Sequence, residues 1–515
     1  MRSLIATALG AACAAALIIP MSLTDTGQSA AHSAHAAPRA VDVPARDTGG
    51  TQSLPLQPLS ANRSGADQGA HGLPVTEVEP FSLVGVVWQD PEAELHGRVE
   101  VRTRETGSGT WSDWQELDAH DDHAPDPGTE EAAGSSMRGG TAPLWVGDAD
   151  AVQVRVLPES GERAASPSSG LPEGLRVELV SPGDSPAGDP AGEGEGDPAG
   201  SPSRYPVGDT YWDAYWSERE DRPSPDGDAG GTAAQDRSAA DDSDSDSDDS
   251  GEDGAGPAVV EGLGERARES SAANAGLAPL GATRIPAAGK ADSEAEAAAL
   301  ARSEADATAA APGGPHVGPR PGIVTRAGWG ADERWRTGGF VYTDTVKTAF
   351  VHHTAMSNDY ACKDVPSVLR SIYRYHTGSQ GWRDVGYNFF VDRCGQIYEG
   401  RAGGVVNAVL GAHTFGFNHN SMGIAVLGTY ASTEPSKEAL DGVAKLTAWK
   451  LGLYGVNPQG SGKRTSAGGK YPKGTTVTLN TVSGHRDGFA TECPGARLYQ
   501  KLPAVRSTAH RLQGR

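Results

Sequence analysis

Apolar and polar residues alternate in short runs between residues 75 and 182. The clearest runs place valine at 99 and 101, and again at 152, 154 and 156, with polar or charged residues between them. A period of two points one set of side chains into a core and the other into water. Glycine, proline and aspartate separate the runs, as in antiparallel turns. The pattern predicts an all-β module over residues 73–182, a small antiparallel sandwich with one solvated face.

Three tryptophans of this module, Trp111, Trp114 and Trp145, allow two interpretations. They could form a platform on which carbohydrate stacks, or they could fill the core. Aromatic side chains supply much of the buried surface of a small domain, so we favour the core.

Residues 316–515 show a different pattern, in which helical and strand periods alternate. Leu440, Val443, Ala444 and Leu451 recur at three, four and seven positions, which predicts an amphipathic helix packed on a sheet. We expect an α/β domain with a central mixed β-sheet flanked by helices. Its expected helices span residues 365–377, 435–454 and 496–512; its expected strands span 347–353, 387–393, 422–428 and 479–484, with a strand or turn at 395–400.

Two stretches lack a sustained pattern and are predicted to be linkers. Residues 37–72 are polar and rich in small residues. Residues 183–315 carry 9 Lys and Arg against 29 Asp and Glu, including a run of Asp and Ser at 241–249. Such a tract buries too little apolar surface to offset chain entropy, so we predict a long disordered acidic linker. Residues 291–310 permit only a marginal helix without tertiary partners.

The first 36 residues resemble a secretory signal peptide. A basic Arg2 precedes an apolar run at 4–23, and small residues follow up to Ala36. An uncleaved anchor is the alternative, because the apolar run is long. No later segment is apolar enough to span a membrane, so we expect a secreted, cell-wall-associated chain whose mature form is not stably inserted in a membrane.

Charge narrows the class of partner. The chain has a net charge of -23, yet residues 321–515 carry 23 basic against 13 acidic residues. A basic domain favours polyanions such as nucleic acid or anionic wall polymers; the alternative is a merely solvated surface. No nucleic-acid-binding motif accompanies the charge, so we predict no nucleic-acid partner.

Histidine and cysteine supply the candidate chemistry. His485 and Cys493 are eight positions apart, and a pair of histidines, His352 and His353, lies in an apolar strand-like run. Two imidazoles and one thiolate can hold Zn²⁺ and leave its fourth position open, as in catalytic zinc sites. Zinc lowers the pKa of a bound water to about 7, which makes a nucleophile at neutral pH. The pattern predicts a zinc hydrolase.

The chain has only four cysteines. Cys13 is lost with the signal peptide and Cys493 is assigned to the metal, which leaves Cys362 and Cys394. In an exported protein we expect a disulfide between them, with about 3 kcal/mol of stabilisation. Two buried thiols are the alternative.

Several motifs of the C-terminal domain together resemble the peptidoglycan recognition protein family, whose zinc-dependent members are N-acetylmuramoyl-L-alanine amidases of the amidase-2 type. The resemblance covers nearly the whole domain in the family's order. The motifs lie at residues 325–331, 350–355, 381–389, 398–401, 411–414, 423–428, 484–487 and 491–495.

The resemblance implies zinc held by His352, His485 and Cys493. It places Tyr387 at the family's catalytic tyrosine and Thr491 where phage-type relatives carry lysine. The alternatives are a core histidine and a core tyrosine. His353 follows the ligand on a strand and is expected to face the other way.

The family also binds substrate in a groove beside the zinc. The matching positions here are His376, Trp382, Arg401, His413 and Asn418. We expect Arg401 to pair with carboxylates of a stem peptide, since a guanidinium binds them bidentately.

Together these features predict a secreted zinc amidase that cuts the bond between the lactyl group of N-acetylmuramic acid and L-alanine in peptidoglycan. Its partners would be the glycan strand and the stem peptide. A non-catalytic peptidoglycan-binding protein is the main alternative, and a zinc peptidase acting on cross-links is a third.

Overall fold

The protein is described by a computed structural model that covers residues 49–59, 69–119, 124–129, 132, 137–159, 170–183, 263–305 and 316–515. Residues 46–515 form one unit. The predicted signal peptide, the run at 241–249 and most of the predicted acidic linker lie outside the described residues. None of the described helices is long and apolar enough to cross a membrane.

The N-terminal module is a single antiparallel sheet, which confirms the all-β prediction. Its order is β1-β8-β3-β7-β4-β5, and β2 and β6 also pair with β3. The alternating valines of β4 and β7 are all buried, as their period predicts. The strands are β1 (Gly50–Pro55), β2 (Gln57–Pro58), β3 (His71–Trp88), β4 (Gly97–Glu105), β5 (Gln115–Leu117), β6 (Gly139–Gly140), β7 (Leu144–Pro158) and β8 (Arg176–Ser181).

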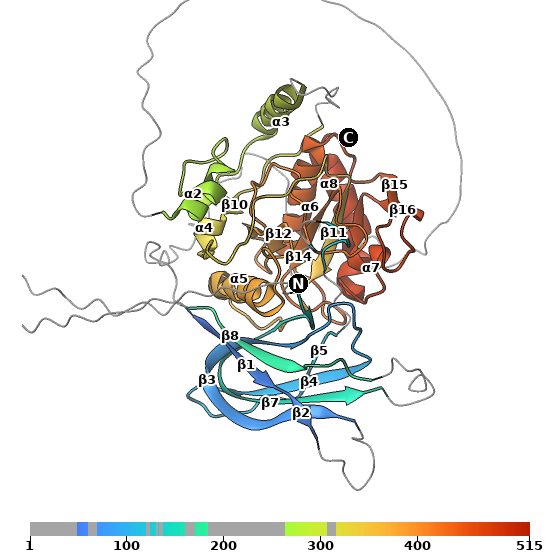
Figure 1. The fold of residues 1–515 in the computed structure, drawn as a ribbon. Coiled ribbons are helices and arrows are strands. Elements are labelled where there is room, and N and C mark those ends of the chain that lie inside the picture. The colour runs from blue at the N-terminus through green and yellow to red at the C-terminus, as the bar shows by residue number, and fades with distance from the viewer. Residues whose placement is uncertain are drawn as a thin grey trace, which may run out of the picture. The chain divides into compact units, whose positions relative to one another are not determined.

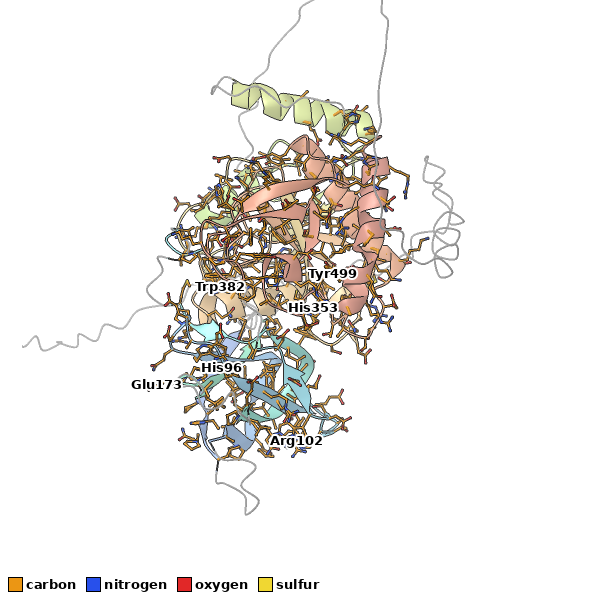
Figure 2. All side chains as sticks on the ribbon, turned by 90° about the vertical axis from the view of Figure 1, so that its right-hand side faces the viewer. His96, Arg102, Glu173, His353, Trp382 and Tyr499 are labelled. Carbon is orange, nitrogen blue, oxygen red and sulfur yellow. A yellow bond between two sulfur atoms is a disulfide. The ribbon has the colours of Figure 1, made fainter. Side chains whose placement is uncertain are left out.

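Two expectations for this module were wrong. Strands β1 and β2 lie inside the stretch 37–72, which is predicted to be a linker. Strand β1 has no alternating pattern of its own and forms by hydrogen bonding to β8. Trp145 packs in the core, but Trp111 and Trp114 are only half-buried. The guanidinium of Arg102, labelled in Figure 2, lies 5.1 Å from the ring centroid of each.

The C-terminal domain contains the predicted mixed sheet, in the order β17-β11-β14-β12-β13-β10-β9. Strand β11 is parallel to both β14 and β17, whereas β12 and β13 are antiparallel. The strands are β9 (Arg284–Ile285), β10 (Ile323–Val324), β11 (Thr348–His353), β12 (Phe389–Val391), β13 (Ile397–Glu399), β14 (Ser421–Val426) and β17 (Val482–Gly484), with a separate hairpin of β15 (Ser461–Thr465) and β16 (Thr476–Asn480).

Helices cover both faces of this sheet (Figure 1). The helices are α2 (Glu265–Ala272), α3 (Lys290–Ala305), α4 (Arg326–Trp329), α5 (Val365–Arg374), α6 (Lys437–Leu453), α7 (His485–Gly488) and α8 (Ala496–Leu512), with short turns η2 (Cys362–Asp364) and η3 (Tyr375–Ser379). Apolar residues of α6 and α8 form one core with Val351 and Ile424 of the sheet. Residues of α5 form a second core with Phe390 and Ala425. The predicted helices are confirmed, and α8 has the predicted bounds.

The described part of the predicted acidic linker is structured, which corrects its boundary. Helix α2 leads into Asn274, whose side chain donates to Glu399 Oε1 over 2.9 Å. Burial raises the pKa of Glu399 to about 7, against the lowering effect of that hydrogen bond. Helix α3 also has tertiary partners, since Lys290 Nζ donates to the carbonyl of Val317 over 2.9 Å. These partners lie in the C-terminal domain, so local composition did not show them.

A buried ion cluster joins helix α2 to the C-terminal domain. The guanidinium of Arg326 bonds to Glu333 over 2.7 Å and to Asp384 over 3.0 Å, and all three side chains are at most 6% exposed. Burial lowers the pKa of Arg326, but the two carboxylates outweigh it and hold the pKa well above its ordinary value. Arg336 extends the cluster to Glu269 of α2 over 2.6 Å.

The predicted disulfide is confirmed. Cys362 and Cys394 are bonded, with their Cα atoms 6.4 Å apart. The bond fastens the start of α5 to the turn between β12 and β13. It therefore ties helix to sheet at the edge of the second core.

Replacing Arg326 tests the cluster. Arg326→Met leaves two buried carboxylates without their cation, which is expected to lower the free energy of unfolding by about 3–5 kcal/mol. Arg334→Met is the matched control, because its side chain is 77% exposed in an ion pair with Asp332, and should cost less than about 0.5 kcal/mol. Urea denaturation followed by tryptophan fluorescence measures both. Equal losses in the two variants would contradict the role of the cluster.

Candidate functional site

The three predicted metal ligands converge in the structure. Ligand atoms of His352, His485 and Cys493 all lie within 4.8 Å of one another, and the three side chains are at most 1% exposed. Cys493 Sγ is 3.8 Å from His352 Nδ1. A zinc ion at about 2.0–2.3 Å from each ligand separates tetrahedral ligands by about 3.5 Å, so the observed spacing fits this ion. Two imidazoles and a thiol are also its preferred donors.

Strand register brings the two histidines together. Val351 of β11 pairs with Gly484 of β17 in a parallel ladder, so His352 and His485 are the next residues at the same sheet edge. Their ring centroids are 4.5 Å apart. His485 is also the first residue of α7, which turns the chain away from the sheet directly after the ligand.

Backbone hydrogen bonds position the third ligand. The amide of His353 donates to Cys493 Sγ over 3.4 Å, and the amide of Arg486 donates to the carbonyl of Cys493 over 3.0 Å. Gly495 then turns the chain at φ +87, where a Cβ atom would lie 2.3 Å from the carbonyl carbon of Tyr430. The sulfur is thereby tied to both histidine segments.

The ring of His353 faces away from the metal ligands, as predicted. Its Nδ1 accepts from the amide of Tyr430 over 3.4 Å on the other side of the strand. Figure 2 labels His353 on the C-terminal domain, together with Tyr499 and Trp382.

Asp487 fixes the segment that carries His485. Its Oδ2 accepts from the amide of Gly484 over 2.9 Å, and its Oδ1 accepts from the hydroxyl of Tyr499 on α8 over 2.7 Å. Burial and this hydrogen bond both raise the pKa of Tyr499. The hydroxyl therefore stays a donor at neutral pH, and α8 holds the ligand-bearing turn.

Thr414 is a neighbour of the metal ligands to which we had assigned no role. Its Oγ1 lies 3.4 Å from His352 Nε2 and 3.0 Å from His413 Nδ1. Nδ1 of His352 faces the sulfur of Cys493, so Thr414 contacts the other ring nitrogen, Nε2. Such outer contacts fix the orientation of a ligating imidazole. The sequence signal was the motif at 411–414, which we had read only for His413.

The two predicted catalytic residues have different surroundings. Tyr387 is 3% exposed, and its ring centroid is 5.5 Å from that of His352, so it lines the metal centre. Thr491 is half-buried, and its Oγ1 accepts from the amide of Cys493 over 3.2 Å. That contact shapes the turn of the ligand; a catalytic role for Thr491 stays a prediction.

The rings of His376 and Trp382 form a stacked pair beside Tyr387. Their rings stack at 4.5 Å between centroids, with an interplanar angle of 29°. His376 lies on η3, and its Nδ1 accepts from the amide of Gly386 over 3.2 Å. The centroid of its ring is 6.0 Å from that of Tyr387. The structure therefore places His376 beside Tyr387 and Trp382 against His376, with both side chains buried.

The other three predicted substrate residues are buried as well, and their contacts hold the chain itself. Arg401 is 6% exposed, and its guanidinium donates to the carbonyls of Val385 and Leu410 over 2.8 and 3.2 Å. His413 and Asn418 are 0% exposed. These contacts give all three a structural role that sequence did not predict. The pairing of Arg401 with a stem-peptide carboxylate has no support in them and stays a prediction.

Two regions of the chain match known families. Residues 36–173 match a family described as "Rv3811 N-terminal galactose-binding domain-like", and residues 342–496 match "N-acetylmuramoyl-L-alanine amidase". The first match begins at the last residue of the predicted signal peptide and includes the whole stretch 37–72 that is predicted to be a linker. The second contains all three candidate metal ligands.

Relatives agree with the second match. Peptidoglycan-recognition protein SC1a of Drosophila melanogaster is 32% identical over 181 residues, which are 35% of this chain and 83% of the relative. A human N-acetylmuramoyl-L-alanine amidase is 31% identical over 188 residues, which are 35% of this chain and 28% of the relative. Among solved structures, wild-type Drosophila PGRP-LB is 26% identical, with a TM-score of 0.29 over 35% of this chain and 92% of that one.

These matches confirm the resemblance inferred from the motifs. The identity extends over most of the length of the Drosophila relative, and the amidase match includes both strands that precede or carry the histidines, β11 and β17. The chain belongs to the family of peptidoglycan recognition proteins and amidase-2 type N-acetylmuramoyl-L-alanine amidases.

Proposed function

We propose that the protein is a secreted, zinc-dependent N-acetylmuramoyl-L-alanine amidase that hydrolyses the amide between the lactyl group and L-alanine of peptidoglycan. The observation that carries the proposal is the convergence of His352, His485 and Cys493 on one buried point. A protein that only recognises peptidoglycan does not need this donor set. Two imidazoles and a thiol buried together suit a metal that is meant to stay bound.

A zinc ion held by these three side chains would supply Lewis-acid chemistry for the hydrolysis of an amide. The chain's own residues orient what surrounds it. Thr414 fixes the ring of His352 through Nε2. Tyr387 lies against His352 and is suited to stabilise negative charge that develops on the amide oxygen, as a hydroxyl donor in an oxyanion hole.

We assign substrate binding, as the resemblance implies, to the region of His376 and Trp382. Both side chains are at most 4% exposed, so the stacked pair stiffens the chain beside Tyr387 rather than offering an open surface. The net positive charge of the C-terminal domain supports an anionic wall polymer as a binding partner. Export rests on the predicted signal peptide at residues 1–36.

The direct test is incubation of the purified protein with peptidoglycan, followed by mass spectrometry of the soluble products. We expect free stem peptides that begin with L-alanine, lost with a chelator and restored by Zn²⁺. Binding without such release would favour the recognition protein, and release of peptides cut within the cross-link would favour the zinc peptidase.

Metal content gives a test that is independent of activity. Cys493→Ala and His485→Ala are each expected to reduce zinc from about one ion per chain to a trace, since two ligands do not hold the ion against dialysis. His419→Ala is the control, because its side chain is 61% exposed and pairs with Asp344. Elemental analysis after dialysis measures this, and stoichiometric zinc in Cys493→Ala would contradict the ligand set.

Tyr387 is tested by removing only its hydroxyl. Tyr387→Phe is expected to lower kcat by about 100-fold while zinc content stays unchanged, which is the usual cost of one oxyanion donor. Tyr342→Phe is the matched control, because Tyr342 is 48% exposed and bonds to the carbonyl of Gly403. A kcat for Tyr387→Phe within twofold of the wild-type value would remove Tyr387 from the mechanism.

A further inference from the structure

The N-terminal module contacts the loop at residues 413–418 through one short segment. The carbonyl of Ala124 accepts from Asn418 Nδ2 over 2.8 Å, and Asp126 Oδ1 accepts from the same nitrogen over 3.0 Å. Asp126 Oδ1 also accepts from the amide of Gly416 over 2.7 Å. Asp126 is 4% exposed, so a carboxylate of the β module is buried against a loop of the C-terminal domain. Burial raises its pKa, against the lowering effect of these hydrogen bonds.

Asn418 carries this contact toward the metal ligands. Its Oδ1 accepts from the amides of His413 and Thr414 over 2.7 and 2.9 Å. The hydroxyl of Thr414 then reaches Nε2 of His352. A continuous series of hydrogen bonds therefore leads from Asp126, through Asn418 and Thr414, to a metal ligand.

The loop depends on these side chains because it has no ladder of its own. The amides of His413, Thr414 and Gly416 are satisfied by side-chain oxygens, and Asp126 supplies the acceptor for Gly416. A buried N–H that loses its acceptor costs about 1–3 kcal/mol. Gly416 also has φ +92, a conformation that few other residues adopt. Asp126 therefore supports the loop conformation from outside the C-terminal domain, together with Asn418 from within it.

The module also contacts η3, the turn that carries His376. The hydroxyl of Tyr375 donates to the carbonyl of Thr141 over 3.1 Å, and Ser379 donates to Glu178 over 3.1 Å. A Cβ atom on Gly85 of β3 would lie 2.5 Å from the ring of Tyr375, so the contact is close. His376, the next residue after Tyr375, stacks on Trp382. The β module thus holds both the loop beside His352 and the turn that bears His376.

We propose that the β module is a positioning element of the candidate active site, and that Asp126 is its positioning residue. Asp126 holds the loop at residues 413–418 in one conformation. Through Thr414 of that loop, it also fixes the contact to His352. The part of the proposal that concerns substrate rests on the proposed amidase function; the part that concerns loop order does not.

The experiment compares Asp126→Ala with Asp126→Asn and with Asp113→Ala in the full chain. Asparagine keeps the Oδ1 acceptor, and Asp113 is an exposed aspartate of the same module. Hydrogen–deuterium exchange is followed by mass spectrometry on peptides that cover residues 413–418. We expect exchange there to rise about 10- to 100-fold in Asp126→Ala, in line with the loss of the hydrogen bonds that Oδ1 accepts from Gly416 and Asn418, and to stay near wild type in the other two. Zinc content should be unchanged.

Kinetics on a soluble muropeptide provide the second readout. A displaced loop is expected to raise KM about tenfold in Asp126→Ala, with a smaller loss in kcat and recovery in Asp126→Asn. Asp126→Ser, whose hydroxyl is one bond shorter than the carboxylate, is the milder variant if alanine prevents folding. It is expected to show the same rise in exchange.

The outcomes separate the two proposals. Exchange at 413–418 that is the same in Asp126→Ala or Asp126→Ser as in Asp113→Ala would overturn the positioning role. Exchange in Asp126→Asn that is as fast as in Asp126→Ala would also overturn the positioning role, because the Oδ1 acceptor would then make no difference. Faster exchange in Asp126→Ala, in a protein that hydrolyses no muropeptide even as wild type, would sustain the positioning role and overturn the amidase.

Discussion

The candidate site depends on parallel pairing of one buried strand with neighbours on both sides. Every residue of β11 is buried, and its register with β14 and β17 is set by backbone hydrogen bonds. A slip by one residue would exchange His352 for His353 and move the imidazole to the other face of the sheet. The ligand geometry is therefore fixed by the ladder, and the side chains only complete it.

A second constraint acts on the irregular chain around this sheet. Between β13 and β14 there is little regular structure, yet most of the residues are buried. Buried polar backbone must find partners, and here side chains supply them. Arg401 donates to carbonyls, Asn388 donates to the carbonyl of Val409, and Asn418 accepts from two amides. Residues that look like substrate contacts in a motif are in part what gives the loop one conformation.

Sequence was sufficient where a local pattern and the tertiary structure coincide. The helical period predicted α6, the coarse alternation of helices and strands predicted α5 and α8, and strand alternation placed His353 away from the metal ligands. The ligand set followed from residue chemistry and from motifs of the family. The pairing of Cys362 with Cys394 followed from counting cysteines.

Prediction failed where partners are distant in the chain. Strand β1 has no alternation of its own and exists because β8 lies beside it. Helix α2 sits in a stretch of linker composition, but Asn274 after it meets Glu399. The same reason explains the burial of His413 and the docking of Asp126. No local pattern indicates which carbonyl or carboxylate a side chain will reach.

The separation of the ligands along the chain affects when a metal can be bound. The sulfur of Cys493 and the ring of His352 are 141 residues apart in sequence. Closing so long a loop is slow, because chain entropy is lost before the distant contact forms. A chain in which β11 and β17 have not yet paired offers the candidate ligands only one at a time, and a single side chain binds metal weakly. The three donor atoms therefore meet only in the folded chain, so a metal held by all three would distinguish folded from unfolded molecules.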